Sequence, residues 1–215
     1  MHHAGTGLSQ ARLVVLAAHG RYGVAEDILK YAEVVNTQDV AWVAPQATNR
    51  SWWSETFLAR VSENEPGLTS ALERLSTIMD ELSQKGFGPE QVVLLGFSQG
   101  ACLVLEHVAR YPRQWRGVVA MSGGLIGTSE SEENPSEELY GHIPKRFEYE
   151  GSLKGVPIHL GCHKDDPVIP VARVRVSKGV LAELGANVTL DVQAGRMHSV
   201  LPRDIQALKG MLLEK

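Results

Sequence analysis

The sequence has 215 residues, enough for one domain with a sizeable hydrophobic core. Hydrophobic residues make up 43% of the chain and charged residues 21%, proportions that are ordinary for a soluble globular protein. The formal net charge is −4 and there is no cluster of Lys or Arg, which argues against nucleic acid as the main partner. No apolar run approaches the ~20 residues that span a bilayer, so we expect no transmembrane segment.

The N-terminal residues 1–11 are polar and glycine-rich and lack the apolar centre of a signal peptide. We expect this segment to be disordered or artificially added, and His2 and His3 therefore not to bind a metal. The chain contains two cysteines, Cys102 and Cys162, too few for a disulfide framework in a protein of this size. These features favour a reducing, cytoplasmic setting.

The first half of the chain alternates between strand-like and helix-like segments. Residues 13–17 form a short apolar run, typical of a strand covered on both faces, and we expect a helix over 24–35. A second strand is expected over 40–44, followed by a long helix over 67–84 whose apolar residues recur at helical spacing. These apolar residues are Leu68, Ala71, Leu72, Leu75, Ile78, Met79 and Leu82.

The second half continues the alternation. The expected elements are strands over 91–95, 117–121, 156–160 and 188–192 and helices over 101–111, 171–184 and 204–213. Apolar and polar residues alternate over 188–192, as in an edge strand exposed on one face. Repeated strand–helix units predict an α/β fold with a mostly parallel, doubly wound sheet and helices on both faces, in one domain over 12–215.

Residues 125–153 interrupt this pattern, because they contain seven glutamates without clear periodicity. One interpretation is an irregular, solvated surface excursion, which we favour. The alternative is a flap beside a functional site, because the segment leaves the carboxyl end of the strand at 117–121.

The pentapeptide Gly96-Phe97-Ser98-Gln99-Gly100 lies between an expected strand and an expected helix. In this context a Gly-x-Ser-x-Gly sequence reads as a nucleophile elbow, a tight turn that presents a strained serine above a helix N-terminus. Small residues two places to either side of Ser98 prevent clashes in such a turn. Cys102, one helical turn further on, is expected to be a small buried side chain rather than a reactive thiol.

A serine nucleophile needs a base and an acid, in the chain order Ser, Asp or Glu, His on this kind of fold. Of the eight histidines, His198 lies in a loop just past a strand and downstream of the acid candidates. Asp166 follows the strand at 156–160, and Pro167 restricts its backbone to extended conformations, so we prefer it to Asp165. No third ligand at useful spacing accompanies this Asp pair, so we expect no metal site.

Acyl transfer also needs hydrogen-bond donors aimed at the developing oxyanion. We expect one from the backbone N–H of Gln99, the residue after the nucleophile. The loop after the first parallel strand, 19–23, should supply the other, and the N–H of Arg21 is its candidate. Taken alone, that loop is equally consistent with a simple glycine-containing turn.

Together these motifs resemble the phospholipase/carboxylesterase family of α/β-hydrolases, which includes the acyl-protein thioesterases. The resemblance runs from about residue 12 to 213 and rests on His19-Gly20, Ala44-Pro45-Gln46, Trp52-Trp53, the elbow at 96–100, Asp166-Pro167-Val168-Ile169-Pro170 and Gly195-x-x-His198. It implies an α/β-hydrolase fold and serine hydrolysis of carboxylic esters or thioesters without a cofactor. The substrate would be a small-molecule or lipid ester.

The sequence departs from the family pattern at two places. Arg21-Tyr22-Gly23 stands where the family has an apolar residue and then Gly-Asp. The chain also begins only about a dozen residues before the first recognised strand, which predicts a sheet that lacks an initial hairpin.

Trp52, Trp53 and Phe57 cluster in the loop after the second strand. We expect Trp52 and Trp53 to contribute at least one ring to the substrate-binding wall, because adjacent tryptophans point in different directions and do not both easily enter one core; packing in the core is the alternative. Met197, next to the candidate base, is a further expected wall residue. A cleft-facing Arg21 side chain would favour substrates with an anionic group.

The favoured function is a serine carboxylesterase. A protein thioesterase or lysophospholipase is the alternative within enzymes, and a catalytically silent, ligand-binding hydrolase fold is the alternative from another class. The oligomeric state is open, a homodimer included.

Overall fold

The computed structural model describes residues 1–129 and 134–213 of the chain. Its centre is a seven-stranded sheet in the order β1-β3-β2-β4-β5-β6-β7, in which β1 is antiparallel to β3 and every other neighbouring pair is parallel. The strands are β1 (His2–Gly5), β2 (Leu13–Ala18), β3 (Val40–Ala44), β4 (Val92–Phe97), β5 (Gly117–Met121), β6 (Pro157–His163) and β7 (Asn187–Gln193).

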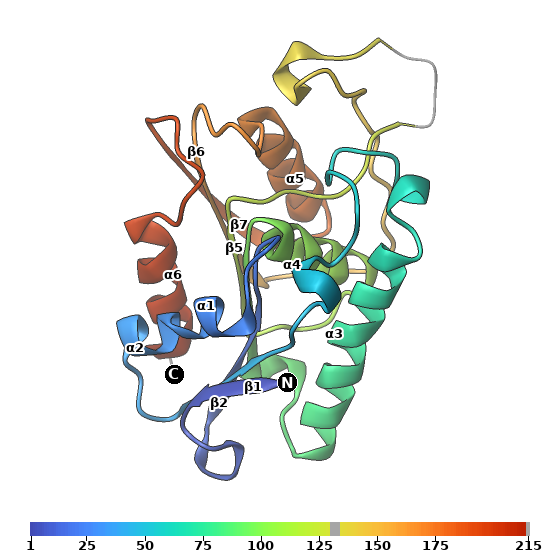
Figure 1. Cartoon of the computed structure of the whole chain (residues 1–215). Coiled ribbons are helices and arrows are strands. Elements are labelled where there is room, and N and C mark those ends of the chain that lie inside the picture. The colour runs from blue at the N-terminus through green and yellow to red at the C-terminus, as the bar shows by residue number, and fades with distance from the viewer. Residues whose placement is uncertain (130–133, 214–215) are drawn as a thin grey trace.

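Helices cover both faces of the sheet, as expected (Figure 1). Residues of α3, α4 and α5 pack in one hydrophobic cluster, and residues of α1, α2 and α6 pack in the other. The helices are α1 (Ala25–Leu29), α2 (Tyr31–Val35), α3 (Gly67–Gln84), α4 (Gln99–Arg110), α5 (Val171–Glu183) and α6 (Pro202–Leu213). The short 3-10 helices are η1 (Leu8–Gln10), η2 (Thr48–Arg50), η3 (Val61–Asn64), η4 (Pro89–Gln91) and η5 (Glu137–Leu139).

The side chains of each central strand divide between the two clusters. In β2, Val14 and Leu16 pack on the α3–α4 side while Leu13 and Val15 pack on the α1–α6 side. Successive side chains of a strand point to opposite faces, so a continuous apolar run is what a strand covered on both faces needs. The prediction from the apolar run at 13–17 is therefore confirmed.

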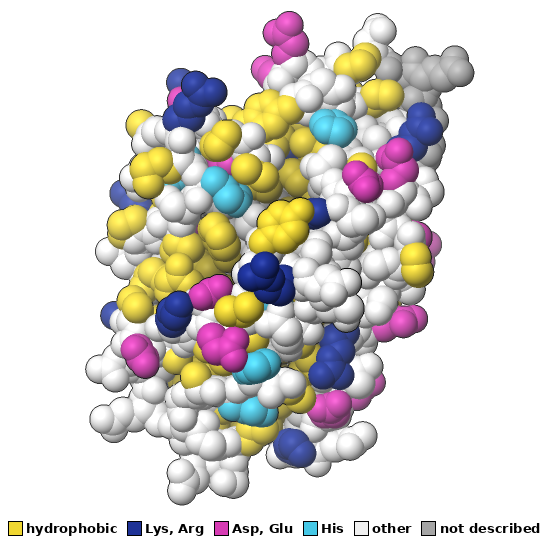
Figure 2. All heavy atoms as spheres, in the orientation of Figure 1, with side chains coloured by type: hydrophobic (Ala, Val, Ile, Leu, Met, Phe, Trp, Pro, Cys, Tyr) yellow, Lys and Arg dark blue, Asp and Glu magenta, His cyan; other side chains and the backbone are white. Residues whose placement is uncertain are grey.

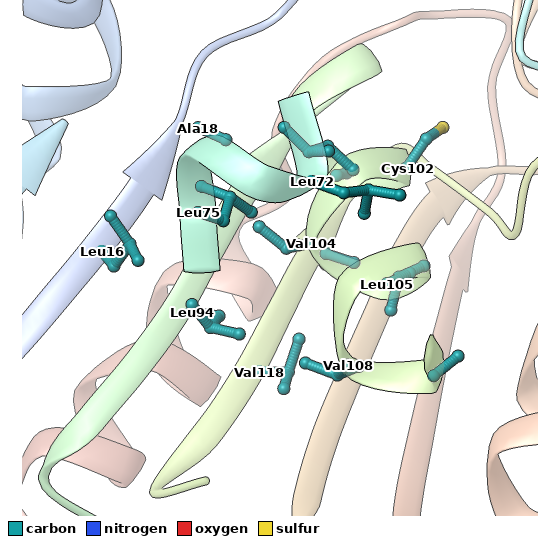
Figure 3. Packing of buried hydrophobic residues seen from close by; sticks show 14 of the residues in the cluster. Leu16, Ala18, Leu72, Leu75, Leu94, Cys102, Val104, Leu105, Val108 and Val118 are labelled. Atoms are coloured by element: carbon teal, nitrogen blue, oxygen red, sulfur yellow. The ribbon is translucent and has the colours of Figure 1, made fainter. Parts of the chain in front are cut away.

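Buried hydrophobic residues pack together where α3 and α4 meet the sheet (Figure 3). Leu72 and Leu75 of α3 face Val104 of α4, above Leu16 and Leu94 of the sheet. Each of the seven apolar positions predicted for α3 is buried. Every residue of α4 from Gln99 to Ala109 is buried, which places the helix that follows Ser98 in the core.

Two expectations about local structure are wrong. The helix expected over 24–35 is divided at Lys30 into α1 and α2. Residues 2–5 are not disordered: they form β1, where Ala4 pairs with Trp42 of β3. This strand could not be predicted because its residues are mostly small or polar, and pairing with β3 is what orders them.

Residues 125–153 are partly buried. Residues 130–133 of this segment, with the three glutamates there, lie outside the described residues. Leu125, Ile126 and Leu153 are fully buried at its ends. The Arg173 guanidinium of α5 donates to the carbonyl of Leu125 at 2.9 Å. The segment is thus anchored to the core at both ends, and between them η5 is the one short helix among its described residues.

In the described part of the chain, no helix is long and apolar enough to cross a bilayer.

Candidate active site

The turn between β4 and α4 has the geometry expected of a nucleophile elbow. Ser98 adopts φ 54° and ψ −120°, a strained conformation for a residue with a side chain. A Cβ at Gly96 would lie 2.3 Å from the carbonyl oxygen of Gly100, and a Cβ at Gly100 would lie 2.1 Å from that of Ala18. Both flanking glycines are therefore required by close backbone approaches.

The structure brings Ser98, His198 and Asp166 into one hydrogen-bonded chain. His198 Nε2 lies 2.8 Å from Ser98 Oγ, and His198 Nδ1 lies 2.8 Å from Asp166 Oδ2. The three residues come from the β4–α4 turn, the β7–α6 loop and the β6–α5 loop, at the carboxyl ends of their strands. The His198 ring also packs against Phe97, with ring centroids 5.2 Å apart.

Asp166 is fully buried, yet it is held as a carboxylate. Burial acts to raise the pKa of Asp166, but hydrogen bonds from His198 and from the amides of Ile169 and Val168 outweigh it and lower the pKa below its usual value. The two amides bind Oδ1 at 3.0 and 2.8 Å, so Oδ2 is directed at His198. This arrangement orients the imidazole and stabilises a positive charge on it.

The two backbone N–H groups expected to donate to an oxyanion belong to the loop at 19–23 and to the start of α4. Among the described residues, the amides of Arg21 and Gln99 have no hydrogen-bond acceptor. Gln99 is the first residue of α4, where an N–H has no partner within the helix. A Cβ at Gly20 would lie 3.3 Å from Ser98 Cβ, which shows how closely the loop at 19–23 approaches the elbow.

The side chains of His19 and Gln99 hold the surrounding loops, a role that sequence analysis did not predict. His19 Nε2 accepts the amide of Ala47 at 3.1 Å, and its Nδ1 lies 2.8 Å from the Gly20 carbonyl. Burial lowers the pKa of His19, which favours the neutral ring that this pattern requires. Gln99 Oε1 accepts the amide of Trp52 at 3.0 Å. The contacts with Ala47 and Trp52 join residues 28 and 47 positions apart, and contacts at such spacings leave no signal in one sequence.

The pocket next to Ser98 has a volume of about 350 Å³. Its lining combines apolar and polar residues: Arg21, Ser54, Glu55, Thr56, Phe57, Ser98, Gln99, Cys102, Val168 and Ile169. Cys102 is fully buried and burial raises the pKa of its thiol to about 12, so it is an inert wall residue, as expected.

The structure places Trp52, Trp53 and Met197 outside the lining of the pocket at Ser98. Both tryptophans are buried in the core cluster and line a neighbouring cavity of about 560 Å³, rather than the pocket at Ser98. Trp52 Nε1 donates to the buried carbonyl of His19 at 2.8 Å, which gives that ring a polar partner inside, whereas the buried Trp53 Nε1 has no partner among the described residues. Met197 is 59% exposed and does not line the pocket.

Two other histidines lie away from the site. His159 in β6 is buried and bonds Asp204, and His107 in α4 is buried and bonds Ser76. Among the described residues no group of three or more His, Cys, Asp or Glu side chains is arranged to hold a metal ion. On the face shown in Figure 2, basic and acidic side chains are interspersed rather than gathered by sign.

The comparisons with known proteins agree on one family. The profile described as Phospholipase/Carboxylesterase matches residues 10–213. A crystal structure of a phospholipase/carboxylesterase from Dyadobacter fermentans has a TM-score of 0.86 and 34% sequence identity, covering 99% of this chain and 95% of that one.

Curated relatives are more distant. The chain is 29% identical over 132 residues to esterase YpfH of Escherichia coli, which covers 61% of this chain and 48% of that protein. It is 26% identical over 164 residues to acyl-protein thioesterase 1 of Saccharomyces cerevisiae, covering 74% and 64%. The matches thus span about half and just under two thirds of these relatives. Since the family profile matches nearly the whole chain, the protein belongs to the phospholipase/carboxylesterase family of α/β-hydrolases.

Proposed function

We propose that this protein is a serine carboxylesterase that cleaves carboxylic esters through an acyl-enzyme intermediate. The observation that carries the proposal is the continuous chain from Ser98 Oγ through His198 to Asp166, with both distances at 2.8 Å. Two amides without an acceptor among the described residues, those of Arg21 and Gln99, and a partly apolar pocket further support it.

Each group has a role in this proposal. His198 Nε2 removes the proton of Ser98 as Ser98 Oγ attacks the ester carbonyl, and the amides of Arg21 and Gln99 donate to the oxyanion. His198 then gives the proton to the leaving alcohol, and Asp166 stabilises the imidazolium. A water molecule, activated in the same way, hydrolyses the acyl-enzyme and restores Ser98. The cycle needs no metal or cofactor.

Thioester hydrolysis at the same site is the second candidate, because a relative is named an acyl-protein thioesterase. The same groups serve either substrate, since the tetrahedral intermediate differs mainly in its leaving atom. A panel of matched short- and long-chain esters and thioesters measures which leaving group and chain length the pocket prefers.

The test is covalent labelling together with ester hydrolysis. A fluorophosphonate probe should label the wild-type protein at Ser98, and Ser98→Ala should abolish both labelling and turnover. We expect His198→Ala to lower kcat by about 10³-fold or more while the protein stays folded. A folded wild-type protein that takes no label and cleaves no ester would favour the silent, ligand-binding alternative.

A further inference from the structure

The loop that carries His198, residues 194–201, has few of its own side chains in the core. Residues 194–197 are exposed, and His198 itself keeps 20% of its side chain accessible. A base on such a loop needs outside contacts to keep its position, because a displacement of about 1 Å can cost two orders of magnitude in rate. The contacts that hold the loop therefore bear on the reaction.

Two buried polar side chains bind the loop just after His198. Ser122 Oγ donates to the carbonyl of Ser199 at 3.2 Å, and Asp204 Oδ2 accepts the amide of Leu201 at 2.7 Å. Both Ser122 and Asp204 are 0% exposed. Water does not compete for these groups, so each contact constrains the loop more than a surface hydrogen bond would.

A second buried His–Asp pair, His159 and Asp204, holds the carboxylate that binds the Leu201 amide. His159 Nε2 in β6 lies 2.8 Å from Asp204 Oδ1, and His159 Nδ1 lies 3.2 Å from the hydroxyl of Thr189 in β7. A buried carboxylate is costly unless it is paired, so His159 holds Asp204 at the start of α6. A Cβ at Gly161 would lie 1.8 Å from Asp204 Oδ1, so this glycine makes the room for the carboxylate.

Ser122 links the nucleophile to the base through the backbone. It follows β5 directly, and the amide of Ser98 donates to the carbonyl of its neighbour Met121 at 2.9 Å. Ser122 adopts φ 53°, a left-handed conformation more typical of glycine or asparagine, and its amide donates to the Gly161 carbonyl at 2.8 Å. One short, rigid segment thus contacts both the elbow of Ser98 and the loop of His198.

We propose that Ser122, supported by the His159–Asp204 pair, is a positioning residue that keeps His198 Nε2 within hydrogen-bond reach of Ser98 Oγ. This inference rests on the proposed function, because it assigns Ser122 a part in the placement of the general base. Ser122 acts through the Ser199 carbonyl and has no chemical role of its own.

The test compares Ser122→Ala with Ser177→Ala. Ser177 is a matched control: it is also 0% exposed, and its hydroxyl accepts the amide of Leu125 at 2.9 Å and donates to the carbonyl of Arg173 at 2.8 Å, on the α5 side of the core. Kinetics are measured per active site, titrated with a fluorophosphonate. We expect Ser122→Ala to lower kcat about fivefold or more with KM nearly unchanged, whereas Ser177→Ala keeps the wild-type kcat.

A spectroscopic readout separates positioning from plain stability. In proton NMR spectra, the low-field signal of the His198–Asp166 hydrogen bond should broaden or shift in Ser122→Ala and stay in place in Ser177→Ala. Ser122→Gly also removes the hydroxyl but suits the left-handed backbone, so it tests the same point if the alanine variant does not fold.

Wild-type kcat in a folded Ser122→Gly or Ser122→Ala variant would overturn this inference, since the hydroxyl would then be merely structural. That result leaves the proposed function standing. A wild-type protein that is neither labelled nor active would overturn the proposed function first, and this inference with it.

Discussion

Arg21 lies in the loop after β2, and the structure gives its side chain definite partners. The guanidinium donates to the carbonyls of Ser54 and Glu55 across the pocket at Ser98. The backbone amide of the same residue is a proposed oxyanion donor. The side chain therefore ties that amide to the opposite wall of the pocket, and two of its N–H groups are already used.

We predict that Arg21→Met lowers kcat/KM for neutral and anionic esters by similar factors, about tenfold, because the oxyanion donor loses its tether. The measurement is kcat/KM on a pair of esters that differ by one carboxylate. Lys85→Met, which removes a positive charge at the end of α3, is the control. A loss confined to the anionic ester would show instead that Arg21 selects substrate charge.

The residues of the candidate triad could be predicted because their order along the chain is informative. Ser98 lies in a local motif, and Asp166 and His198 follow expected strands, which a parallel sheet brings to one edge. The roles of Trp52 and Trp53 could not be predicted in this way. Which side of a loop faces the core depends on distant partners, here the His19 carbonyl and the Gln99 side chain.

At the scale of elements, α3 and β3 have the bounds expected from the sequence, since strong periodicity and a following proline define them. The division of the segment 24–35 into two helices could not be predicted, because neither such periodicity nor a proline marks it in the sequence.

A buried histidine joins α3 to α4: His107 Nε2 lies 3.1 Å from Ser76 Oγ, and its Nδ1 has no partner among the described residues. The packing of these two helices thus buries the His107 imidazole in a place that disfavours its protonated form.

This histidine predicts a pH dependence of stability. Burial, and secondarily the charge of Arg113, lowers the pKa of His107 to about 4, whereas an unfolded chain has a value of about 6.5. The resulting stability is fully present above pH ~6.5 and is lost as the pH falls through about 4. Between pH 7 and 4.5, wild type should lose on the order of 2 kcal/mol more unfolding free energy than His107→Gln.

Urea unfolding at the two pH values measures this difference. His3→Gln, at an exposed position in β1, serves as the control and should follow the wild type. Parallel pH dependence in wild type and His107→Gln would contradict the prediction.

On the scale of the whole molecule, the sheet lies between two helical layers, and the candidate site lies where the carboxyl ends of its strands meet. At one edge β1 pairs with β3 and covers it, with Gly5 at φ 69° packed against Trp42. At the other edge, β7 is only half covered, as its alternating sequence predicted. The two edges are thus protected in different ways.

Deletion of residues 1–7 should lower the unfolding free energy by about 2 kcal/mol or more and promote aggregation, because the edge of β3 loses its partner strand. Thermal unfolding and light scattering measure the two effects. His2→Ala, which removes only the partly exposed contact with Glu26, should change stability by less than about 1 kcal/mol. An unchanged melting temperature after the deletion would show that β1 does not stabilise the sheet.

The sequence by itself determined the class of fold, the alternation of its elements and the choice of the three candidate triad residues. These properties depend on hydrophobic periodicity and on chain order, both of which are local or one-dimensional. The tertiary structure alone decided which side chains line the pocket at Ser98, which tryptophans enter the core, and how Ser122 and Asp204 hold the His198 loop. Such contacts join residues far apart in the chain, and they arise only when packing brings buried polar groups to the partners that they need.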